Sequence, residues 1–419
     1  MKHALKALIF CAVLISSIFA SAQGLPQIAP DVVGLSPDGV RAMDSVMARY
    51  TAADRYPAAM LMVARNGKVG YWKAFGVRDL DRRDPLNRND VFRIFSLTKP
   101  ITTTAVLMLW EQGKLGLDDP AARYVPPLAR LRVQDGSSGT RPPRQPLTIR
   151  HLLTFTSGLT YGIWGTGSPA EAAARAAKIG SRAQSLDHLM NLISDLPLVG
   201  DPGTIASYGW QMEVLGKIVE VVSGQSLDRF LAEKIFSPLR IRETGFFVPS
   251  ALLARVPILY NVSEGKAPAR ATATDWTDAF GAPPKVLWGG GGLYATASDY
   301  IRFAQMIANR GELEGVRLLR PATVEMVTRV QVRPDLPGMT ALVGPGLAYG
   351  FGCVVATDIK AAGGGGSDGL FYFSGAGNLF VWIDRQTGVV GMVWAQALPY
   401  QAYPMFVDVR RAVAGAVVK

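Results

Sequence analysis

Ser96 and Lys99 stand three residues apart in Phe95-Ser96-Leu97-Thr98-Lys99, a spacing that can support nucleophilic catalysis. On a helix, residues three apart share one face, so the serine hydroxyl would lie beside the lysine amine. The amine can accept the hydroxyl proton, and the free backbone N–H of Ser96 at a helix start can donate to an oxyanion. The pattern therefore indicates attack on an ester or amide carbonyl by Ser96.

Two other serine motifs compete with this one. Ser263-Glu264-Gly265-Lys266 repeats the Ser-x-x-Lys spacing, but no helix-forming segment follows it. The glycine-rich stretch 365–369 matches a Gly-x-Ser-x-Gly nucleophile elbow around Ser367, which needs a following helix and a later histidine. The last histidine of the chain is His188, and we interpret both it and His151 as structural helix residues. Both competing motifs are therefore interpreted as loops.

The segments around Ser96 are expected to hold it in a buried site. A strand-like run, Val91–Phe95, precedes it, and the run Ile101–Leu115 is apolar on nearly every side. A helix that is apolar all round is usually buried. This context distinguishes Ser96 from Ser263.

The rest of the chain predicts an α/β (α+β) protein. A helix is expected to start at Ser36-Pro37, and Asn66-Gly67 predicts a β-hairpin between two apolar runs. Short turns separate three strand-like runs near the C-terminus, and such runs form an antiparallel sheet: Tyr349–Ala356, Leu370–Ile383 and Val389–Gln396. We expect residues 23–120 and 284–419 to form a sheet domain flanked by helices, and residues 121–283 a mainly helical domain.

Composition and charge argue against several kinds of function. The chain has 419 residues and a formal net charge of +11, yet no block of lysine and arginine points to nucleic acid. With 3 histidines, 2 cysteines and no closely spaced ligand pair, the sequence predicts no metal site. It contains no phosphate-binding loop, so we expect no cofactor. The oligomeric state stays open.

Residues 1–22 have the features of a signal peptide. Lys2 and Lys6 precede an apolar run over 7–19, and Ala20-Ser21-Ala22 gives the small-x-small cleavage pattern. The run is short for a membrane span. We therefore expect a periplasmic or secreted protein with no stable membrane insertion after removal of the signal. An uncleaved N-terminal anchor is the alternative.

Five stretches occur in the order found in the serine β-lactamase and penicillin-binding-protein superfamily, and they resemble its class C-like branch. They are Phe95–Lys99, Leu147–Leu159, Pro202–Gly216, Gly289–Tyr300 and Phe373–Gly377. The resemblance implies a β-lactamase-like fold, with Ser96 as the acylated nucleophile and with Lys99 and Tyr208 sharing the base and acid work. It also implies an oxyanion hole formed by the backbone N–H groups of Ser96 and Ala376.

Phe373 departs from the class C pattern, in which lysine or histidine begins the third motif and binds a substrate carboxylate. An aromatic residue there is similar to the family VIII carboxylesterases, which implies ester substrates. The substrate-binding residues that we expect are Phe373, Ser374, Gly375, Tyr161, Trp164, Trp210 and Trp288.

Several functions are compatible with this scaffold. Our preferred expectation is a secreted serine hydrolase that cleaves small-molecule esters, with short acyl chains, through acyl-Ser96. A β-lactamase, a D-amino-acid peptidase or an acyltransferase would use the same three residues. A non-catalytic envelope binding protein would keep the fold without the chemistry.

Overall fold

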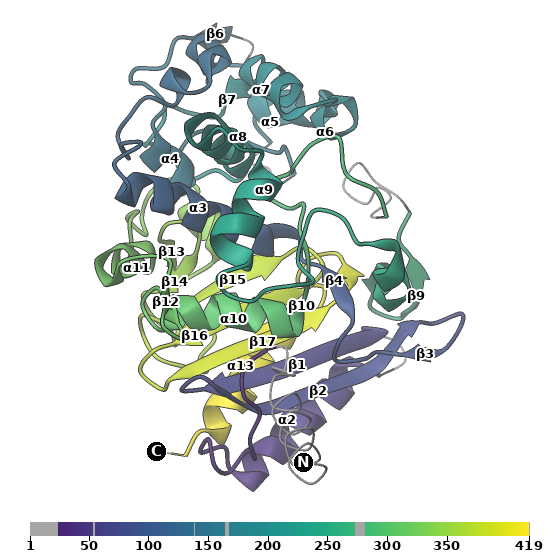
Figure 1. The fold of residues 1–419 in the computed structure, drawn as a ribbon. Coiled ribbons are helices and arrows are strands. Elements are labelled where there is room, and N and C mark those ends of the chain that lie inside the picture. The colour runs from purple at the N-terminus through teal and green to yellow at the C-terminus, as the bar shows by residue number, and fades with distance from the viewer. Residues whose placement is uncertain (1–23, 53–54, 138, 164–166, 273–280, 419) are drawn as a thin grey trace, which may run out of the picture.

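The computed structural model describes residues 24–52, 55–137, 139–163, 167–272 and 281–418. The predicted signal peptide lies outside these residues. The centre of the molecule is an eight-stranded antiparallel sheet in the order β13-β14-β15-β16-β17-β1-β2-β3 (Figure 1). Its strands are β1 Ala58–Arg65, β2 Lys68–Asp79, β3 Asp84–Pro85, β13 Leu347–Tyr349, β14 Val354–Ala356, β15 Phe371–Gly375, β16 Leu379–Asp384 and β17 Val389–Ala395.

The sheet combines both ends of the described chain, as the sequence predicts. The hairpin of β1 and β2 turns at Asn66 and Gly67, whose φ angles of 51° and 79° are the positive values that a two-residue hairpin turn needs. β1 then pairs with β17, so that Ala59 lies opposite Ala395. The predicted hairpin and its place in the sheet are confirmed.

The prediction of three C-terminal strands is wrong in number, because two of the runs contain sharp turns. Tyr349–Ala356 contains the end of β13 and the whole of β14, with Gly352 at φ 67° between them. Leu370–Ile383 contains β15 and most of β16, which are separated by a turn in which Asn378 has φ 60°. The pairing of all these strands is antiparallel, as predicted.

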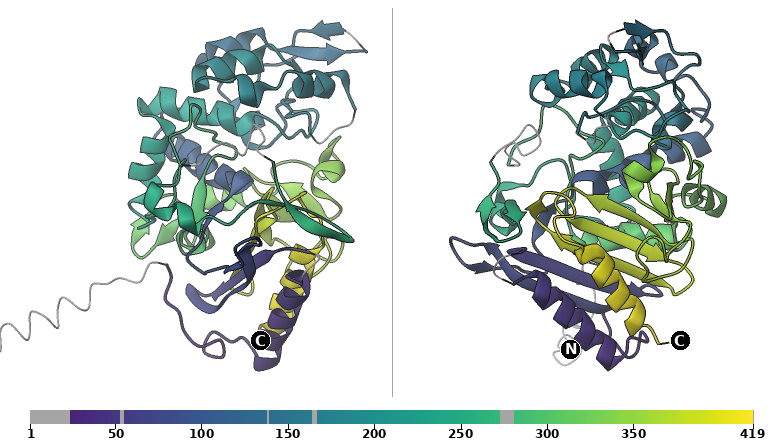
Figure 2. Two further views of the ribbon diagram at one scale, coloured as in Figure 1. Left: turned by 90° about the vertical axis from the view of Figure 1, so that its right-hand side faces the viewer. Right: turned by 180° about the vertical axis from the view of Figure 1, so that it is seen from behind.

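Two layers of helices cover the sheet, because alternate residues of its strands point to opposite faces. On one face α2 (Pro37–Tyr50) and α13 (Met405–Ala416) lie side by side (Figure 2) and pack on residues such as Leu61. The other face carries α3 (Lys99–Glu111) and α10 (Ala297–Ala308). Ser36 caps α2 by accepting a hydrogen bond from the Gly39 N–H at 3.1 Å, which confirms the predicted helix start.

A mainly helical region lies beyond α3, at the top of Figure 1. Its helices are α4 Ile149–Leu153, α5 Pro169–Ala176, α6 Ile179–Arg182, α7 Leu186–Ser194, α8 Gln211–Ser223 and α9 Leu227–Leu231, with helical turns at Ala121–Arg123, Pro126–Arg130 and Ala232–Phe236. A small sheet of β5 Arg132–Asp135, β6 Gly139–Arg141 and β7 Pro197–Leu198 accompanies them. The domain boundaries themselves stay a prediction.

The remaining elements lie between these helices and strands along the chain. They are β4 Val91–Arg93, β8 Tyr260–Ser263, β9 Lys266–Arg270, β10 Tyr294–Thr296, β11 Glu312–Leu313, β12 Val316–Arg317, β18 Ala397–Leu398, α11 Pro321–Val327, α12 Met339–Val343 and the turn Ser250–Arg255. β8 and β9 fall inside the predicted helical range 121–283, yet β8 pairs with β18 next to the C-terminal strands. The predicted α/β class, with an antiparallel sheet flanked by helices and a mainly helical region, is confirmed.

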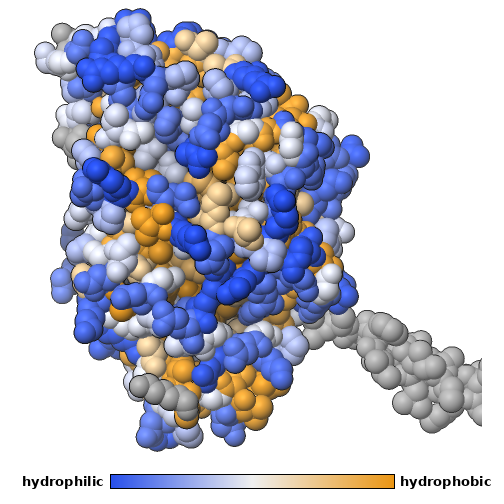
Figure 3. Space-filling view, turned by 90° about the vertical axis from the view of Figure 1, so that its left-hand side faces the viewer, coloured by the Kyte–Doolittle hydropathy of each residue, from blue (hydrophilic) through white to orange (hydrophobic). Residues whose placement is uncertain are grey.

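The surface is mixed in character. On the face that carries α4 and α11, polar and charged residues interrupt the apolar ones throughout (Figure 3). Across the described ranges, every helix is too short or too polar to traverse a lipid bilayer.

Candidate active site

Ser96 lies in a single 3-10 turn, Phe95–Thr98, between β4 and α3. The preceding strand is shorter than predicted, and Lys99 rather than Ser96 begins the α-helix. Phe95 adopts φ 47°, a left-handed conformation that is unfavourable for a residue with a Cβ. Strain of this kind persists only where surrounding contacts impose it, and it is frequent at active sites.

Hydrogen bonds from two other segments impose this turn. Tyr300 of α10 donates its buried hydroxyl to the Leu97 carbonyl at 2.8 Å. The Leu293 N–H donates to Thr98 Oγ1 at 3.2 Å, and the Thr98 hydroxyl donates to the Phe95 carbonyl at 2.7 Å. The position of the serine therefore depends on α10 and on the segment before β10.

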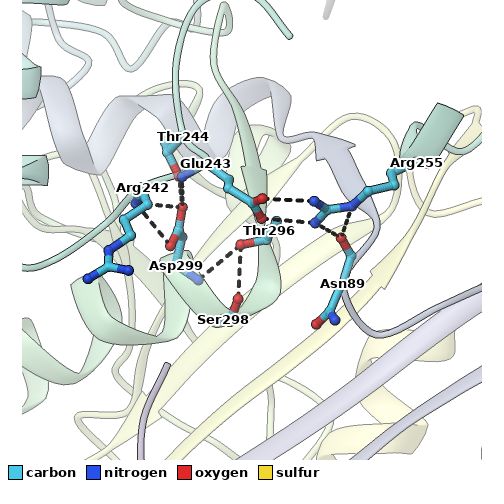
Figure 4. Close-up of polar contacts among 8 residues, drawn as sticks. All are labelled: Asn89, Arg242, Glu243, Thr244, Arg255, Thr296, Ser298 and Asp299. Atoms are coloured by element: carbon cyan, nitrogen blue, oxygen red, sulfur yellow. Dashed lines mark hydrogen bonds and ion pairs between the residues drawn. The ribbon is translucent and has the colours of Figure 1, made fainter. Parts of the chain in front are cut away.

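Asp299 anchors the beginning of α10 (Figure 4). Its buried carboxylate accepts hydrogen bonds from the N–H groups of Arg242 and Glu243, at 3.2 and 2.7 Å, and from the Thr244 hydroxyl at 3.0 Å. These bonds tie the start of the helix to a loop of the neighbouring segment. Asp299 thus fixes α10, the helix whose Tyr300 holds the turn that carries Ser96.

Lys99 and Tyr208 both contact the Ser96 hydroxyl at the separation that the sequence interpretation requires. Lys99 Nζ donates to Ser96 Oγ at 3.0 Å, and the Tyr208 hydroxyl donates to it at 2.7 Å across 112 positions of sequence. Lys99 is 3% exposed and also donates to the Gly290 carbonyl at 2.6 Å. The three side chains form one hydrogen-bonded group.

Aromatic and backbone contacts position Tyr208. The Phe155 ring stacks on the Tyr208 ring with centroids 5.4 Å apart and an 8° angle between planes, and Tyr161 meets it edge-on at 5.7 Å. The Tyr161 N–H also donates to the Tyr208 carbonyl at 3.1 Å. A Cβ at Gly209 would lie 2.4 Å from Thr160 Cα, so this close approach requires glycine.

Glu213 of α8 is a site residue that the sequence interpretation missed. It is fully buried and accepts hydrogen bonds from the Gly290 N–H and the Tyr161 hydroxyl, both at 3.0 Å. Burial raises the pKa of this carboxyl, while the positive charge of Lys99 opposes the rise. The Gly290 N–H donates to Glu213, and the Gly290 carbonyl accepts from Lys99. Glu213 therefore helps to position the lysine through Gly290. A glutamate among the apolar residues of a helix was the available signal.

A cavity of about 270 Å³ opens beside Ser96. Its described lining residues are Ser96, Tyr208, Thr340, Ala341, Leu342, Val343, Gly344, Tyr349, Val354, Tyr372, Ser374, Gly375, Ala376, Tyr400 and Gln401. None of these carries a formal charge at neutral pH, and burial raises the pKa of Tyr400 to about 12. The cavity therefore suits an uncharged ligand.

The end of β15 brings the predicted oxyanion donors to the same place. A Cβ at Gly375 would lie 2.5 Å from the Ile94 carbonyl, so β15 passes directly against the nucleophile turn. Ala376 follows and lines the cavity together with Ser96. Their joint role as an oxyanion hole stays a prediction.

The structure divides the seven expected substrate-binding residues. Ser374 and Gly375 line the cavity, whereas Phe373 is 4% exposed and packs among the side chains on the α3 and α10 face of the sheet. Neighbouring residues of a strand point to opposite faces, so Phe373 and Ser374 point to different sides of β15. The Phe373 ring is therefore not among the described residues that line this cavity, and its substrate-binding role stays a prediction.

The other aromatic residues form a cluster on the far side of Tyr208. Tyr161 meets Trp210 edge-on at 4.7 Å, and Trp210 lies 6.1 Å from Trp288. None of these three is among the described residues that line the cavity. Their substrate-binding role stays a prediction, and Trp164 lies outside the described residues.

The competing serine motifs occupy turns and loops. Ser263 and Lys266 face each other across the hairpin of β8 and β9. Ser367 lies in a glycine-rich loop and donates to Asp384 Oδ2 at 3.1 Å. His151 accepts a hydrogen bond from the Thr148 N–H at 3.2 Å, as part of the N-terminal cap of α4. Within the described ranges, no three histidine, cysteine or acidic side chains form a group that could hold a metal ion.

The fold and the Ser96, Lys99 and Tyr208 group define a serine hydrolase. A family model described as Beta-lactamase matches residues 43–415, and the chain belongs to this family. Esterase EstB of Burkholderia gladioli is 31% identical over 390 residues, which cover 88% of this chain and 94% of the esterase.

Two further similarities concern acyl transfer. Monacolin J acid methylbutanoyltransferase of Aspergillus terreus is 26% identical over 395 residues, covering 87% of this chain and 92% of the transferase. The solved structure of EstCE1, a hydrolase with promiscuous acyltransferase activity, superimposes with a TM-score of 0.77 at 24% identity, over 90% of this chain and 99% of EstCE1. The resemblance to the superfamily and to its carboxylesterases is confirmed.

Proposed function

We propose that this chain is a periplasmic or secreted carboxylesterase that hydrolyses neutral esters through an acyl-enzyme on Ser96. One observation carries the proposal: Ser96 Oγ lies 3.0 Å from Lys99 Nζ and 2.7 Å from Tyr208 Oη, beside a cavity with no charged lining residue among those described. The location rests on the signal-like residues 1–22 alone.

Acylation follows from these contacts. Ser96 Oγ attacks the ester carbonyl carbon while its proton passes to whichever of Lys99 and Tyr208 is deprotonated in the reactive state, since both lie within hydrogen-bonding distance. The backbone N–H groups of Ser96 and Ala376 stabilise the oxyanion. The bond from the acyl carbon to the alcohol oxygen then breaks, and Tyr208 supplies the proton that converts the leaving alkoxide into a free alcohol.

Deacylation runs through the same groups in reverse. A water molecule takes the place of the alcohol and gives a proton to Tyr208 or Lys99 as it attacks the acyl carbon. The bond to Ser96 Oγ breaks, the serine regains its proton, and the carboxylic acid leaves. Lys99 stays in place throughout because the Gly290 carbonyl also holds it.

The cavity favours esters over substrates that carry a carboxylate. A carboxylate entering it would lose water without gaining a cationic partner from the described lining residues. Phe373 stands in the sequence where the class C-like third motif begins with lysine or histidine. β-Lactams and D-amino-acid peptides both carry such a carboxylate and are therefore disfavoured.

Acyl transfer to an alcohol is the second candidate function. The similarity to monacolin J acid methylbutanoyltransferase and EstB supports a shared acyl-enzyme, from which either water or an alcohol could remove the acyl group. The two functions differ only in whether water or a second alcohol takes the acyl group from Ser96.

The test compares p-nitrophenyl butyrate turnover by the wild type, Ser96→Ala and Ser367→Ala. We expect Ser96→Ala to lose about 1,000-fold or more in kcat/KM, since nucleophile, base and oxyanion donors act as a unit. Ser367→Ala is the matched control from the Gly-x-Ser-x-Gly loop and should keep its activity. Equal turnover by wild type and Ser96→Ala, or a nitrocefin rate comparable with the ester rate, would contradict the proposal.

A further inference from the structure

Ser374, Tyr400 and Gln401 form a polar group on the cavity wall that the hydrolytic chemistry does not use. The Tyr400 hydroxyl donates to Ser374 Oγ at 3.0 Å, and Gln401 Nε2 lies 3.4 Å from the Tyr400 oxygen, to which it donates. All three residues line the cavity that opens beside Ser96. Much of the remaining lining is apolar, for example Leu342 and Val343 of α12.

The group is built rigidly rather than left on a loose loop. Asn378 is 1% exposed, and its side-chain N–H groups donate to the carbonyls of Ala397 and Pro399, each at 2.8 Å. Its side-chain oxygen accepts from the Gln401 N–H at 2.8 Å. These bonds hold Gln401 at φ 55°, a conformation that non-glycine residues rarely adopt. Such strain is concentrated at binding and catalytic sites.

The Tyr400 ring is fixed as well. It packs on Phe380 with centroids 5.6 Å apart, and Phe380 in turn stacks on Phe406 at 4.3 Å. Because burial raises the pKa of Tyr400 to about 12, its hydroxyl is neutral and acts as a hydrogen-bond donor.

Hydrogen-bonding capacity remains after these internal contacts. Ser374 accepts from Tyr400, and no described residue accepts from the serine O–H, which can donate into the cavity. Gln401 uses its N–H₂ group, and no described residue donates to its side-chain carbonyl, which can accept. One donor and one acceptor side by side match a hydroxyl group, which can accept from the first and donate to the second.

The proposed function places the alcohol portion of the ester in this cavity. In the proposed mechanism Tyr208 hands a proton to the leaving oxygen, so that oxygen must lie next to the Tyr208 hydroxyl. Tyr208 lines the same cavity as Ser374 and Tyr400, so the carbon chain behind the leaving oxygen can extend toward the polar group.

We propose that Ser374, Tyr400 and Gln401 form a subsite for a hydroxyl group on the alcohol portion, which selects esters of uncharged diols and polyols over esters of simple alcohols. This inference rests on the proposed function, because the acyl-Ser96 chemistry determines which end of the ester lies in the cavity. By the same geometry, polyols are the preferred acceptors if the acyl group is transferred instead of hydrolysed.

The experiment measures kcat/KM for two esters of equal shape, 2-hydroxyethyl butyrate and propyl butyrate. Both give the same butyryl-enzyme and need the same acid, base and oxyanion donors, so general damage to the site cancels in their ratio. We expect the wild type to prefer the hydroxyethyl ester about tenfold, as one or two neutral hydrogen bonds allow. Ser374→Ala and Gln401→Met should each reduce this ratio severalfold.

The controls separate the possible failures. Thr340→Val removes another hydroxyl from the cavity lining and should leave the ratio unchanged. Gln401 is exposed, so its substitution is tolerated by the fold even if Ser374→Ala is not. A wild type that hydrolyses both esters equally, or a ratio that survives both substitutions, would overturn the subsite while leaving the esterase proposal intact. Failure of the proposed function would instead show as unchanged turnover in Ser96→Ala.

A second measurement uses the acyl-enzyme directly. The wild type is given p-nitrophenyl butyrate with equal concentrations of ethylene glycol and 1-propanol, and the two butyrate esters formed are quantified. Because both alcohols meet the same butyryl-enzyme, an excess of the glycol ester supports the subsite. An equal or reversed product ratio would contradict it.

Discussion

Gly209→Ala tests whether the position of Tyr208 depends on one close backbone contact. The added Cβ would lie 2.4 Å from Thr160 Cα and 2.5 Å from Thr160 N, and both of these are backbone atoms. Ordinary contact begins near 3.4 Å, so the two segments must separate by about 1 Å. This chain therefore leaves no room for a side chain directly after Tyr208.

The expected cost follows from that displacement. A misplacement of about 1 Å in a catalytic group lowers the rate about 100-fold, and overpacking costs about 1–3 kcal/mol of stability. The assay is kcat/KM for p-nitrophenyl butyrate together with a thermal unfolding curve. Lower kcat/KM with a modestly lower Tm is the predicted outcome.

Gly415→Ala is the matched control. Gly415 lies in α13, and a Cβ there would meet no atom within 4 Å. Alanine is the better helix former by about 1 kcal/mol, so this variant should be at least as stable as the wild type and fully active. Wild-type kcat/KM in Gly209→Ala, or equal losses in both variants, would refute the reasoning about Thr160.

Three further predictions concern neighbouring residues. Tyr208→Phe keeps the ring stacked on Phe155 but removes the hydroxyl that serves as acid and base. The value of kcat/KM should therefore fall about 100- to 10,000-fold with little change in Tm. A loss below tenfold would exclude Tyr208 from proton transfer. Burial raises the pKa of Glu213, so the wild type loses stability as pH rises from about 4.5 through the raised pKa. Glutamine at position 213 does not ionise, so the Tm of Glu213→Gln relative to the wild-type Tm should rise over this pH window. A constant difference in Tm would contradict the raised pKa. Tyr300→Phe leaves the buried Leu97 carbonyl without its donor and should cost about 1–3 kcal/mol in urea unfolding, whereas an unchanged midpoint would argue against this contact.

Short-range patterns predicted much of the fold. The cap at Ser36 and the turn at Asn66 depend on neighbouring residues alone, and both are present in the structure. The turn at Gly352 was missed although glycine adopts left-handed conformations readily, and so was the turn at Asn378. Its side chain has partners on residues some 20 positions away, which no local pattern reveals.

The site was predictable where its residues fall in ordered motifs and not elsewhere. Ser96, Lys99 and Tyr208 each belong to such a motif, and the structure brings them together. The order of the motifs did not reveal that the Phe373 side chain packs in the core on the α3 and α10 face of the sheet. The sequence interpretation missed Glu213 because Gly290, which donates a hydrogen bond to it, lies 77 positions away in the chain.

The most direct test of the central claim is the mass of the protein during turnover. Wild type mixed with p-nitrophenyl butyrate and quenched in acid should gain the mass of one butyryl group, and the modified peptide should carry it on Ser96. Ser96→Ala should gain no mass under the same conditions. A butyryl group found on another residue, or turnover by the wild type without any covalent adduct on Ser96, would contradict the account.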